Sequence, residues 1–416
     1  MSNHLTTLRC ATLALTATLA LACGSDDDDT PSGEAYASWA ASPQDYAEAF
    51  PGGMPPEAVT FEDQTLRHVV RLSAGGESLR VRVSNLFGSE PLVLDAVEVA
   101  PSQGGSAIQA DSTVSLTFDG DTSTTIAPGA EVWSDFVAFS AAAEATLAIS
   151  IYVSEATPLA TLHSLGQQTA YIAPGNLVTA SSLGDTDPET RTTYQWITGV
   201  DVSSASARRV IVAFGDSITD GFASTVDAHH RYPNYLSARA TGPSAPAAFS
   251  VVNAGISGNR VLNDVVGPSG GSRFERDALG QTGVSDVIIL LGINDIGFSG
   301  FAPDQAVEAT AITQGLEAMV DAASARGVRT FLATLLPFQG TMAPYYTDAG
   351  EAKRQAVNDW IRTQTVAAGV IDFDALMSDP NAPLAMQPSY DSGDHLHPND
   401  AGYSTMAGAV DLTLFQ

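Results

Sequence analysis

The 416-residue sequence contains only two cysteines, one lysine and no long apolar segment of the kind that forms a lid. Both cysteines, Cys10 and Cys23, lie in the first 23 residues, so a chain that has lost a leader of this length cannot form an intramolecular disulfide. The 18 basic residues stand against 47 acidic ones, a formal net charge of −29. Without a basic patch, nucleic acid and anionic membrane surfaces are disfavoured as partners.

Residues 1–23 have the features of a secretory leader. One basic residue, Arg9, precedes an uncharged run at residues 10–22 that is too short to span a bilayer. The run ends in LALAC, which resembles a bacterial lipobox with Cys23 as the acylated residue; the alternative is an ordinary signal peptide cleaved at a nearby alanine. We expect an exported bacterial protein, membrane-anchored if Cys23 is lipidated and otherwise secreted or periplasmic.

Residues 24–35 are predicted to form an acidic flexible linker. Four consecutive aspartates at positions 26–29 favour a solvated tether, and calcium binding by this run is the weaker alternative. The strong acidity of the whole chain suits an extracellular protein or a protein of a saline habitat, and composition does not separate the two.

Residues 36–204 alternate apolar and polar side chains with a period of two. Residues 78–84 read SLRVRVS and residues 147–153 read LAISIYV, each with an apolar residue at every second position. Glycine-containing turn clusters separate such runs at short intervals. This pattern predicts an all-β domain of the β-sandwich type.

Residues 205–416 change to apolar strands that alternate with helices. The expected strands are 210–214, 249–253, 284–291, 328–335 and 370–373, and the expected helices are 232–240, 273–279, 303–326, 348–368 and 400–414. This alternation predicts a parallel sheet covered by helices on both faces. Functional side chains of such sheets gather beyond the carboxyl ends of the strands.

Three motifs follow the first three of these strands. In GDSITDG, residues 215–221, Ser217 opens a helix with its hydroxyl exposed and its N–H free for an anion; the alternative is a serine N-cap. Gly258 in NAGISGNR and Asn294 in LGINDI are candidate donors to an oxyanion. For Asn294 the alternative is the capping of a turn or helix.

The fourth motif, DHLHPND at residues 394–400, supplies a base. Asp394 stands three residues before His397, which suits a hydrogen bond to Nδ1 that leaves Nε2 for the proton of Ser217. His395 is expected to point elsewhere. A metal site is disfavoured because the motif lacks further ligands.

These four motifs resemble those of the SGNH hydrolases, or GDSL-type esterases. The resemblance covers residues 208–416 and implies a three-layer α/β/α fold with a five-stranded parallel sheet and no cofactor. It further implies a catalytic triad of Ser217, His397 and Asp394, and an oxyanion hole made by the N–H groups of Ser217 and Gly258 with the Asn294 side chain. A β-rich half before such a domain is similar to secreted esterases that deacylate plant polysaccharides.

The expected function is hydrolysis of short-chain carboxylic esters, O-acetyl groups on polysaccharides included, with no metal. A lipase, arylesterase or thioesterase is the alternative chemistry, and a carbohydrate-binding module on an inactive hydrolase scaffold is the alternative class. Asp216 is expected to cap the helix of Ser217 or to support its turn. Arg260 and Arg273 are expected either to touch substrate oxygens or to pair with surface carboxylates.

Overall fold

The first half of the described chain is built from antiparallel strands. The computed structural model describes residue 1 and residues 33–49, 56–205, 209–242, 245 and 249–416, so the predicted leader, Cys23 and nearly all of the acidic linker lie outside the described residues. The strands are β1 (Glu34–Ala40), β2 (Gln44–Asp45), β3 (Thr60–Phe61), β4 (Gln64–Arg71), β5 (Gly76–Ser84), β6 (Leu92–Leu94), β7 (Ala96–Gly104), β8 (Ala107–Ile108), β9 (Val114–Ser115), β10 (Thr124–Ile126), β11 (Glu131–Trp133), β12 (Val137–Ala141), β13 (Thr146–Val153), β14 (Thr157–Pro158), β15 (Thr161–His163), β16 (Ala170–Pro174), β17 (Glu189–Arg191), β18 (Tyr194–Gln195) and β19 (Ile197–Ser204).

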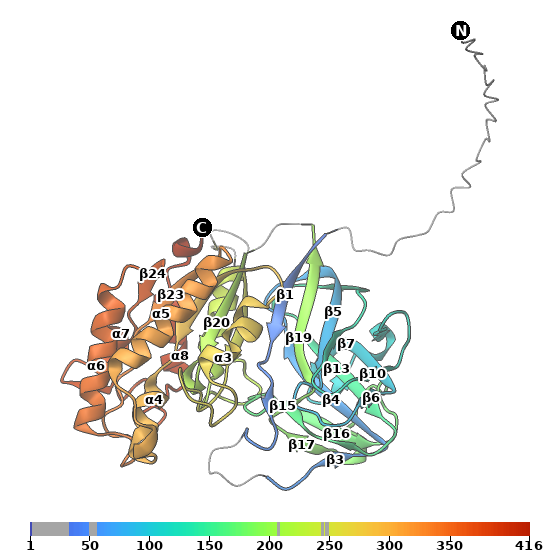
Figure 1. The fold of residues 1–416 in the computed structure, drawn as a ribbon. Helices are drawn as coiled ribbons and strands as arrows, with labels where there is room; N and C mark the ends of the chain where they lie inside the picture. Colours follow the sequence, from blue (N-terminus) through green and yellow to red (C-terminus); the bar gives the residue numbers. More distant parts are fainter. Residues whose placement is uncertain (2–32, 50–55, 206–208, 243–244, 246–248) are drawn as a thin grey trace. The chain divides into compact units, whose positions relative to one another are not determined.

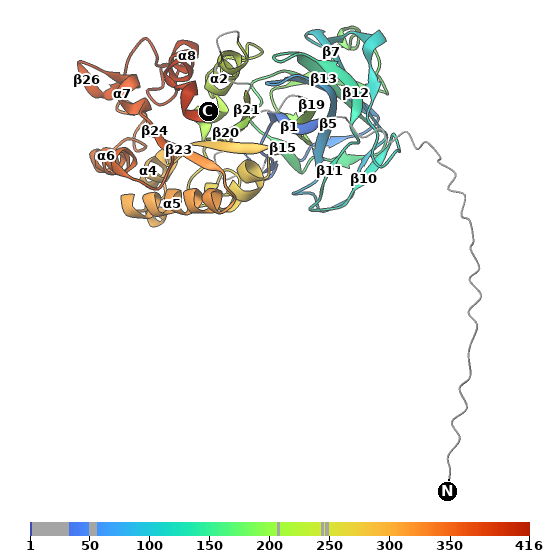
Figure 2. The ribbon, with the colours of Figure 1, turned by 90° about the horizontal axis from the view of Figure 1, so that it is seen from above.

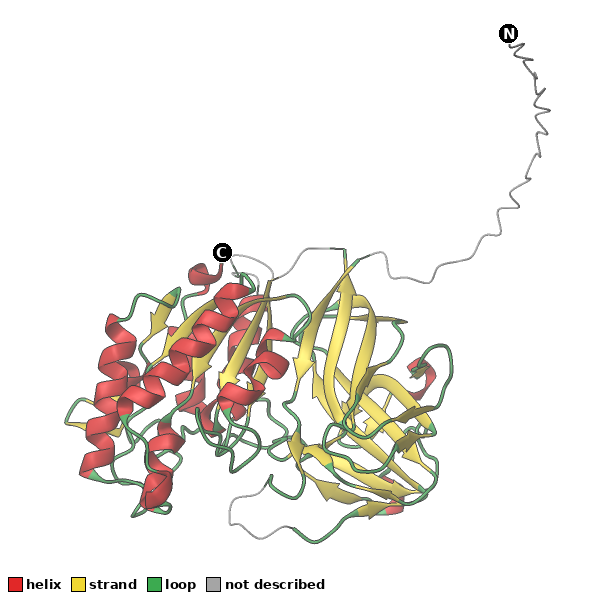
Figure 3. Cartoon of the chain, in the orientation of Figure 1, coloured by secondary structure: helices red, strands yellow, loops and turns green. Residues whose placement is uncertain are grey.

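Two larger sheets enclose the core of this half (Figures 1 and 3). One has the order β1-β19-β5-β11, with β12 also on β5, and the other has the order β17-β16-β4-β13-β7-β8. Leu79 and Val81 of the first sheet and Leu66 and Val70 of the second belong to one buried apolar cluster. The predicted β-sandwich is therefore confirmed, because the alternating apolar positions of both sheets face one shared core.

The second half is a parallel sheet between two layers of helices. Its strands are β20 (Arg209–Gly215), β21 (Phe249–Gly255), β22 (Val284–Leu290), β23 (Arg329–Ala333) and β24 (Gly369–Ile371), in the order β21-β20-β22-β23-β24, with a small hairpin of β25 (Ser378–Asp379) and β26 (Ala382–Met386). Its helices are α1 (Ser217–Asp220), α2 (Tyr232–Thr241), α3 (Gly270–Phe274), α4 (Ile293–Gly297), α5 (Ala309–Ala325), α6 (Asp348–Thr363), α7 (Phe373–Met377) and α8 (Asp400–Ala409). Figure 2 shows α2, α7 and α8 on one face of the sheet and α4, α5 and α6 on the other. The predicted three-layer fold with five parallel strands is confirmed.

The register of the sheet aligns the ends of three strands. Gly215 at the end of β20 pairs with Gly255 of β21 on one side and with Leu290 of β22 on the other. The residues that follow these three strands therefore emerge side by side at one edge of the sheet. The first three motifs of the sequence all lie there.

Four predicted helices are shorter or less regular than expected. The predicted helix 400–414 ends at Ala409, and after extended backbone at Val410 the chain forms a 3₁₀ turn, Leu412–Phe415. In place of the predicted helix 303–326, the chain forms a 3₁₀ turn, Pro303–Gln305, then extended backbone, and then α5. In the extended part, the carbonyl of Val307 accepts a hydrogen bond from the Nζ of Lys353 at 2.6 Å. The predicted helix 348–368 ends at Thr363 because Gln364 turns to extended backbone and its Oε1 accepts from the N–H groups of Val366 and Ala367. The predicted helix 273–279 is α3 followed by a π-helical turn, Glu275–Leu279.

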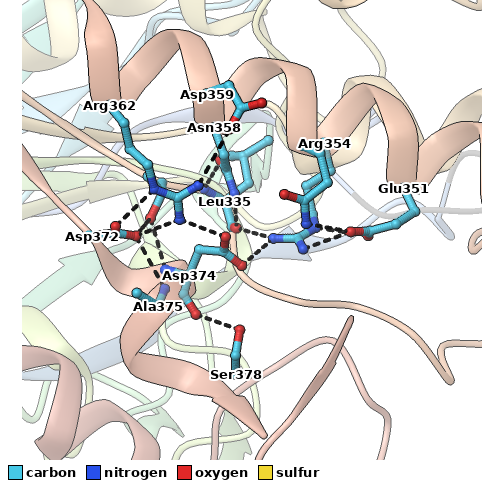
Figure 4. Close-up of polar contacts among 12 residues, drawn as sticks. Leu335, Glu351, Arg354, Asn358, Asp359, Arg362, Asp372, Asp374, Ala375 and Ser378 are labelled. Atoms are coloured by element: carbon cyan, nitrogen blue, oxygen red, sulfur yellow. Dashed lines mark hydrogen bonds and ion pairs between the residues drawn. The ribbon is translucent and has the colours of Figure 1, made fainter. Parts of the chain in front are cut away.

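A buried ion network fastens α6 to the chain beyond β23 and β24 (Figure 4). Arg354 is fully buried and binds Glu351, Asp374 and the carbonyl of Leu335. Asn358 binds the backbone of the same residue twice: its Oδ1 accepts from the N–H of Leu335 at 2.8 Å, and its Nδ2 donates to the carbonyl of Leu335 at 2.9 Å. Since every charge in the network has a partner, its burial is tolerated and the geometry is specified. The network holds the segment that leads from β23 towards Tyr345.

Strand β1 joins the two halves. Tyr36, Ala37 and Ala40 belong to the apolar core of the α/β half, although β1 pairs with β19 of the β half. The N–H of Ala37 donates to the carbonyl of Thr282 at 2.9 Å. The described residues from position 33 to the C-terminus accordingly form a single compact unit.

Candidate active site

Ser217 opens α1 directly after the tight turn that ends β20. Asp216 caps this helix, with its Oδ1 accepting from the N–H of Ile218 at 3.0 Å, which confirms the interpretation of Asp216 as a helix cap. A Cβ at Gly215 would lie 2.4 Å from the carbonyl oxygen of Leu290, so only glycine fits there. Burial raises the pKa of Asp216 to about 7. The turn thus places the serine at the sheet edge on a helix N-terminus.

Ser217, His397 and Asp394 form a continuous chain of hydrogen bonds. Ser217 Oγ lies 2.8 Å from His397 Nε2, and His397 Nδ1 lies 2.6 Å from Asp394 Oδ2. Asp394 Oδ1 accepts from the N–H groups of Leu396 and His397, at 2.9 and 2.8 Å. Partial burial raises the pKa of Asp394, but the hydrogen bonds from His397 and Leu396 outweigh it and hold the pKa well below its usual range. This is the arrangement of a nucleophile, a base and a group that orients the base.

The neighbouring histidines are engaged elsewhere. His395 pairs with Asp391 at 2.6 Å and its side chain is half exposed. His230 pairs with Asp400 at 2.7 Å, which ties the start of α8 to the loop between α1 and α2. Phe222 on that loop packs against the ring of His397, with 4.4 Å between ring centroids. Within the described ranges, no group of three His, Cys, Asp or Glu side chains is arranged to hold a metal ion.

The candidate oxyanion donors lie on the loops after β21 and β22. Gly258 has a φ of +79°, and neither its N–H nor that of Ser217 has a hydrogen-bond acceptor among the residues that the structure describes. Asn294 Nδ2 donates to the carbonyl of Asn259 at 2.9 Å, which places this side chain beside the Gly258 loop. Since Gly292 occupies the N-cap of α4 and no side chain caps that helix, the alternative role of Asn294 as a helix cap is wrong.

Tyr345 fixes the orientation of Asn294. Its hydroxyl donates to Asn294 Oδ1 at 2.8 Å. Burial raises the pKa of Tyr345 well above its ordinary value, so the phenol stays protonated and remains a donor. With Oδ1 bound to Tyr345 and one hydrogen of Nδ2 bound to Asn259, the second hydrogen of Nδ2 is left to donate.

Arg273 differs from expectation, whereas for Arg260 only the expected pairing with surface carboxylates is wrong. Arg273 is buried and donates to the carbonyls of Gly215 and Ala254 at 2.8 Å each, so it neither touches a substrate nor pairs at the surface. It holds the turns after β20 and β21 together. Arg260 donates to Gln305 Oε1 at 2.9 Å and lines an apolar cavity.

This apolar cavity, of about 500 Å³, flanks the Gly258 loop. Val266 in its wall would touch a Cβ placed at Gly258 at 3.0 Å, and Phe298 packs edge-on against Tyr345 with 5.8 Å between centroids. Its lining consists of Arg260, Val265, Val266, Phe298, Phe301, Ala302 and Gln305. The cavity therefore lies beside Gly258 and beside Tyr345, the residue that binds Asn294.

The comparison with family models decides the class. Residues 213–404 match the GDSL-like lipase/acylhydrolase family. These residues form a GDSL hydrolase domain. The resemblance inferred from the four motifs is thus confirmed, and the protein is a carboxylic ester hydrolase.

Several solved structures are similar to about half of this chain. A catalytic mutant of an acetylxylan esterase from Geobacillus stearothermophilus shares 22% identity over 49% of this chain and 92% of that chain, with a TM-score of 0.39. The aryl esterase from M. smegmatis shares 19% identity over 49% and 96%, with a TM-score of 0.39. A carbohydrate acetylesterase from Sinorhizobium meliloti shares 16% identity over 48% and 95%, with a TM-score of 0.37. Among curated proteins, none matches the chain.

Several residues support the site in ways that the sequence analysis did not predict. Asp295 accepts from the N–H groups of Val261 and Leu262 at 2.7 and 3.2 Å, and burial raises its pKa to about 6. Tyr345 and Arg273 act over long sequence separations. Asp295 directly follows Asn294 within the motif LGINDI, and this position was the signal that could have identified it. The others have no motif of their own.

Proposed function

We propose that this protein is an exported serine esterase that cleaves short-chain carboxylic esters. The observation that carries the proposal is the hydrogen-bonded chain Ser217–His397–Asp394, with links of 2.8 and 2.6 Å. Each residue is within direct hydrogen-bond reach of the next, as proton transfer from a hydroxyl to an imidazole requires. The free N–H groups of Ser217 and Gly258 lie at the same edge of the sheet.

In the proposed reaction Ser217 Oγ attacks the ester carbonyl while His397 Nε2 takes the hydroxyl proton. Asp394 holds the ring by its Nδ1–H and stabilises the imidazolium. The carbonyl oxygen becomes an oxyanion, and His397 then donates its proton to the leaving alcohol. A water molecule repeats the attack on the acyl-enzyme with His397 again as base, which releases the acid and restores Ser217.

The oxyanion hole is proposed to consist of the N–H groups of Ser217 and Gly258 and the Nδ2 of Asn294. Donors that are fixed before the reaction stabilise the charge that develops on the carbonyl oxygen and lower the barrier. Asn294 is held by Tyr345 and by the carbonyl of Asn259, and this support makes it a rigid donor.

For the natural substrate we propose O-acetyl groups on a polysaccharide. A cavity of about 550 Å³ in the β half is lined by Pro56, by Leu162 and by hydroxyl-bearing and charged side chains that suit sugar hydroxyls; the latter are Tyr46, Thr169, Glu189, Thr190, Arg191, Thr192 and Thr193. Thr169 binds Asp227 at 2.7 Å. Asp227 belongs to the loop between α1 and α2 whose Phe222 packs on His397. A polymer in this cavity would therefore run alongside the loop that borders the base.

The apolar cavity favours a second candidate, an esterase for apolar acyl or aryl groups. Val265 and Phe301 of its lining are 45% and 51% exposed, so an apolar substituent would cover them and gain from their burial. A carbohydrate-binding role on an inactive scaffold is disfavoured, because the hydrogen-bonded chain from Ser217 to Asp394 is complete.

A substrate panel separates these proposals. We expect the purified protein to cleave p-nitrophenyl acetate with a higher kcat/KM than the butyrate and octanoate, and to release acetate from acetylated xylan. A preference for the octanoate that is lost in Phe301→Ala would instead support the apolar candidate. If no ester in the panel is cleaved above the rate of Ser217→Ala, the proposed function is wrong.

We further propose export and anchoring through Cys23, which lies outside the described residues. The support is the leader-like composition of residues 1–23 and the LALAC ending. In the part of the chain that the structure describes, no helix is long and apolar enough to cross a membrane. We expect the protein expressed in a bacterium to enter the detergent phase on partitioning, and Cys23→Ala to remain in the aqueous phase. A Cys23→Ala variant that still partitions with detergent would refute lipid anchoring.

A further inference from the structure

The β half places a histidine against the hydrolase half. His163, the last residue of β15, is buried, and its Nε2 lies 2.9 Å from Asp220 Oδ1, whose carboxylate is also buried. Its Nδ1 lies 3.0 Å from the carbonyl of Ser42, a second residue of the β half. Both ring nitrogens therefore have an oxygen atom within hydrogen-bond distance. The ring is thereby held from both sides.

Asp220 in turn connects the nucleophile to the candidate oxyanion loop. It is the last residue of α1, the single helical turn that begins at Ser217. Its Oδ1 faces His163, and its Oδ2 accepts from the N–H of Ser257 at 2.9 Å. Ser257 directly precedes Gly258. One carboxylate therefore sets the distance between the two backbone segments that carry the proposed N–H donors.

The packing around Asp220 leaves little room for adjustment. A Cβ at Gly255 would lie 2.4 Å from the backbone nitrogen of Asp220, so the end of β21 already touches α1. Asn253 adds a second link, from its Nδ2 to the carbonyl of Thr219 at 2.8 Å. A shift of the Asp220 carboxylate is consequently passed to the Ser257–Gly258 peptide and is not absorbed by loose packing.

We propose that His163 is a positioning residue for ester hydrolysis. Through Asp220 it fixes the Ser257–Gly258 peptide relative to Ser217 and so keeps the two N–H donors at the spacing that the oxyanion requires. The β half then completes the active site and is more than an attached binding module. This inference rests on the proposed serine mechanism, since it assigns His163 a task within the proposed oxyanion hole.

The expected kinetic signature is a change in kcat with little change in KM. Oxyanion donors act mainly on the tetrahedral state, so their displacement weakens transition-state binding more than substrate binding. Loss of a whole donor costs about 100- to 1000-fold in rate. For His163→Leu, which displaces a donor without removing it, we expect kcat for p-nitrophenyl acetate to fall about tenfold.

Matched variants separate positioning from general destabilisation. His163→Gln offers an amide N–H to Asp220 and should recover most of kcat. Ser73→Ala removes a buried hydrogen bond of the same interface, in which Ser73 Oγ lies 2.6 Å from Ser250 Oγ. Ser250 is near the start of β21, whereas Gly258 follows the end of that strand. It should lower the unfolding temperature and leave kcat close to the wild-type value. Amide hydrogen exchange of the segment around Ser257 should rise in His163→Leu and stay unchanged in Ser73→Ala.

A double-mutant cycle gives the decisive outcome. In an Asp220→Ala background, the further change His163→Leu should have no added effect on kcat, because the link to Ser257 is already lost. Independent, multiplicative losses would overturn the proposal, as would a His163→Leu variant with wild-type kcat and wild-type exchange at Ser257. If His163→Leu does not fold, the same cycle is run with His163→Asn, whose shorter amide can still donate to the carbonyl of Ser42 but does not reach Asp220. Activity that survives Ser217→Ala would refute the serine mechanism itself, whereas an inactive Ser217→Ala beside an unaffected His163→Leu refutes only the positioning role.

Discussion

Replacing Ser217 with alanine is expected to lower kcat for p-nitrophenyl acetate on the order of 10⁶-fold. The change removes the nucleophile, so no acyl-enzyme forms and only the remaining donors and the base can assist water. The residue stands at the start of α1 with its hydroxyl 2.8 Å from His397 Nε2. Among the described residues, no other hydroxyl forms a hydrogen bond with that nitrogen. Steady-state rates of the purified variant measure the loss directly.

The matched control is Ser224→Ala. Ser224 is a buried serine on the loop after α1, and its Oγ donates to the carbonyl of Gly221 at 2.7 Å, away from the proposed proton transfer. We expect its kcat to stay close to the wild-type value. Circular dichroism of both variants establishes that they are folded. A folded Ser217→Ala protein with wild-type kcat would contradict the proposed mechanism.

The second large effect is expected for Asn294→Ala, with kcat lowered about 100- to 1000-fold and KM nearly unchanged. The substitution removes one donor to the oxyanion and leaves Ser217, His397 and Asp394 in place. Because the two backbone donors remain, the activity should stay measurable, in contrast to Ser217→Ala. Initial rates over a range of substrate concentrations separate kcat from KM.

Tyr345→Phe serves as the graded comparison. It removes the hydroxyl that binds Asn294 Oδ1 but keeps the bond from Nδ2 to the carbonyl of Asn259. Its kcat should therefore lie between those of the wild type and Asn294→Ala. A wild-type kcat in Asn294→Ala, or a larger loss in Tyr345→Phe than in Asn294→Ala, would exclude Asn294 as an oxyanion donor.

The site shows why some of its parts were predictable and others were not. Asp394 and His397 are three residues apart on one loop, so their contact follows from local geometry. Gly215, Gly258 and Asn294 follow apolar runs, and parallel pairing brings the ends of such runs to one edge. The contact between Ser217 and His397 spans 180 residues, so it was expected from the chemistry of the two motifs and from the resemblance to a family, and local geometry does not predict it.

The residues that escaped prediction act through distant partners. Tyr345 reaches Asn294 across 51 residues and His163 reaches Asp220 across 57, and no spacing rule connects such pairs. Arg273 was expected at the cleft or the surface because arginine is seldom buried. Five backbone and side-chain acceptors around it reverse that expectation, since a guanidinium whose three nitrogens all donate hydrogen bonds can be buried.

By itself the sequence determined the two periodicities, the five buried strands, the three motifs at strand ends and the fourth motif before the last helix. These follow from local rules: side chains alternate along a strand, helices repeat every 3.6 residues, and glycine permits tight turns. Only the tertiary structure decided that β1 contributes to both cores and that His163 of the β half binds Asp220 of the hydrolase half. Such contacts depend on how two faces pack, and packing is a property of the folded chain that no local pattern encodes.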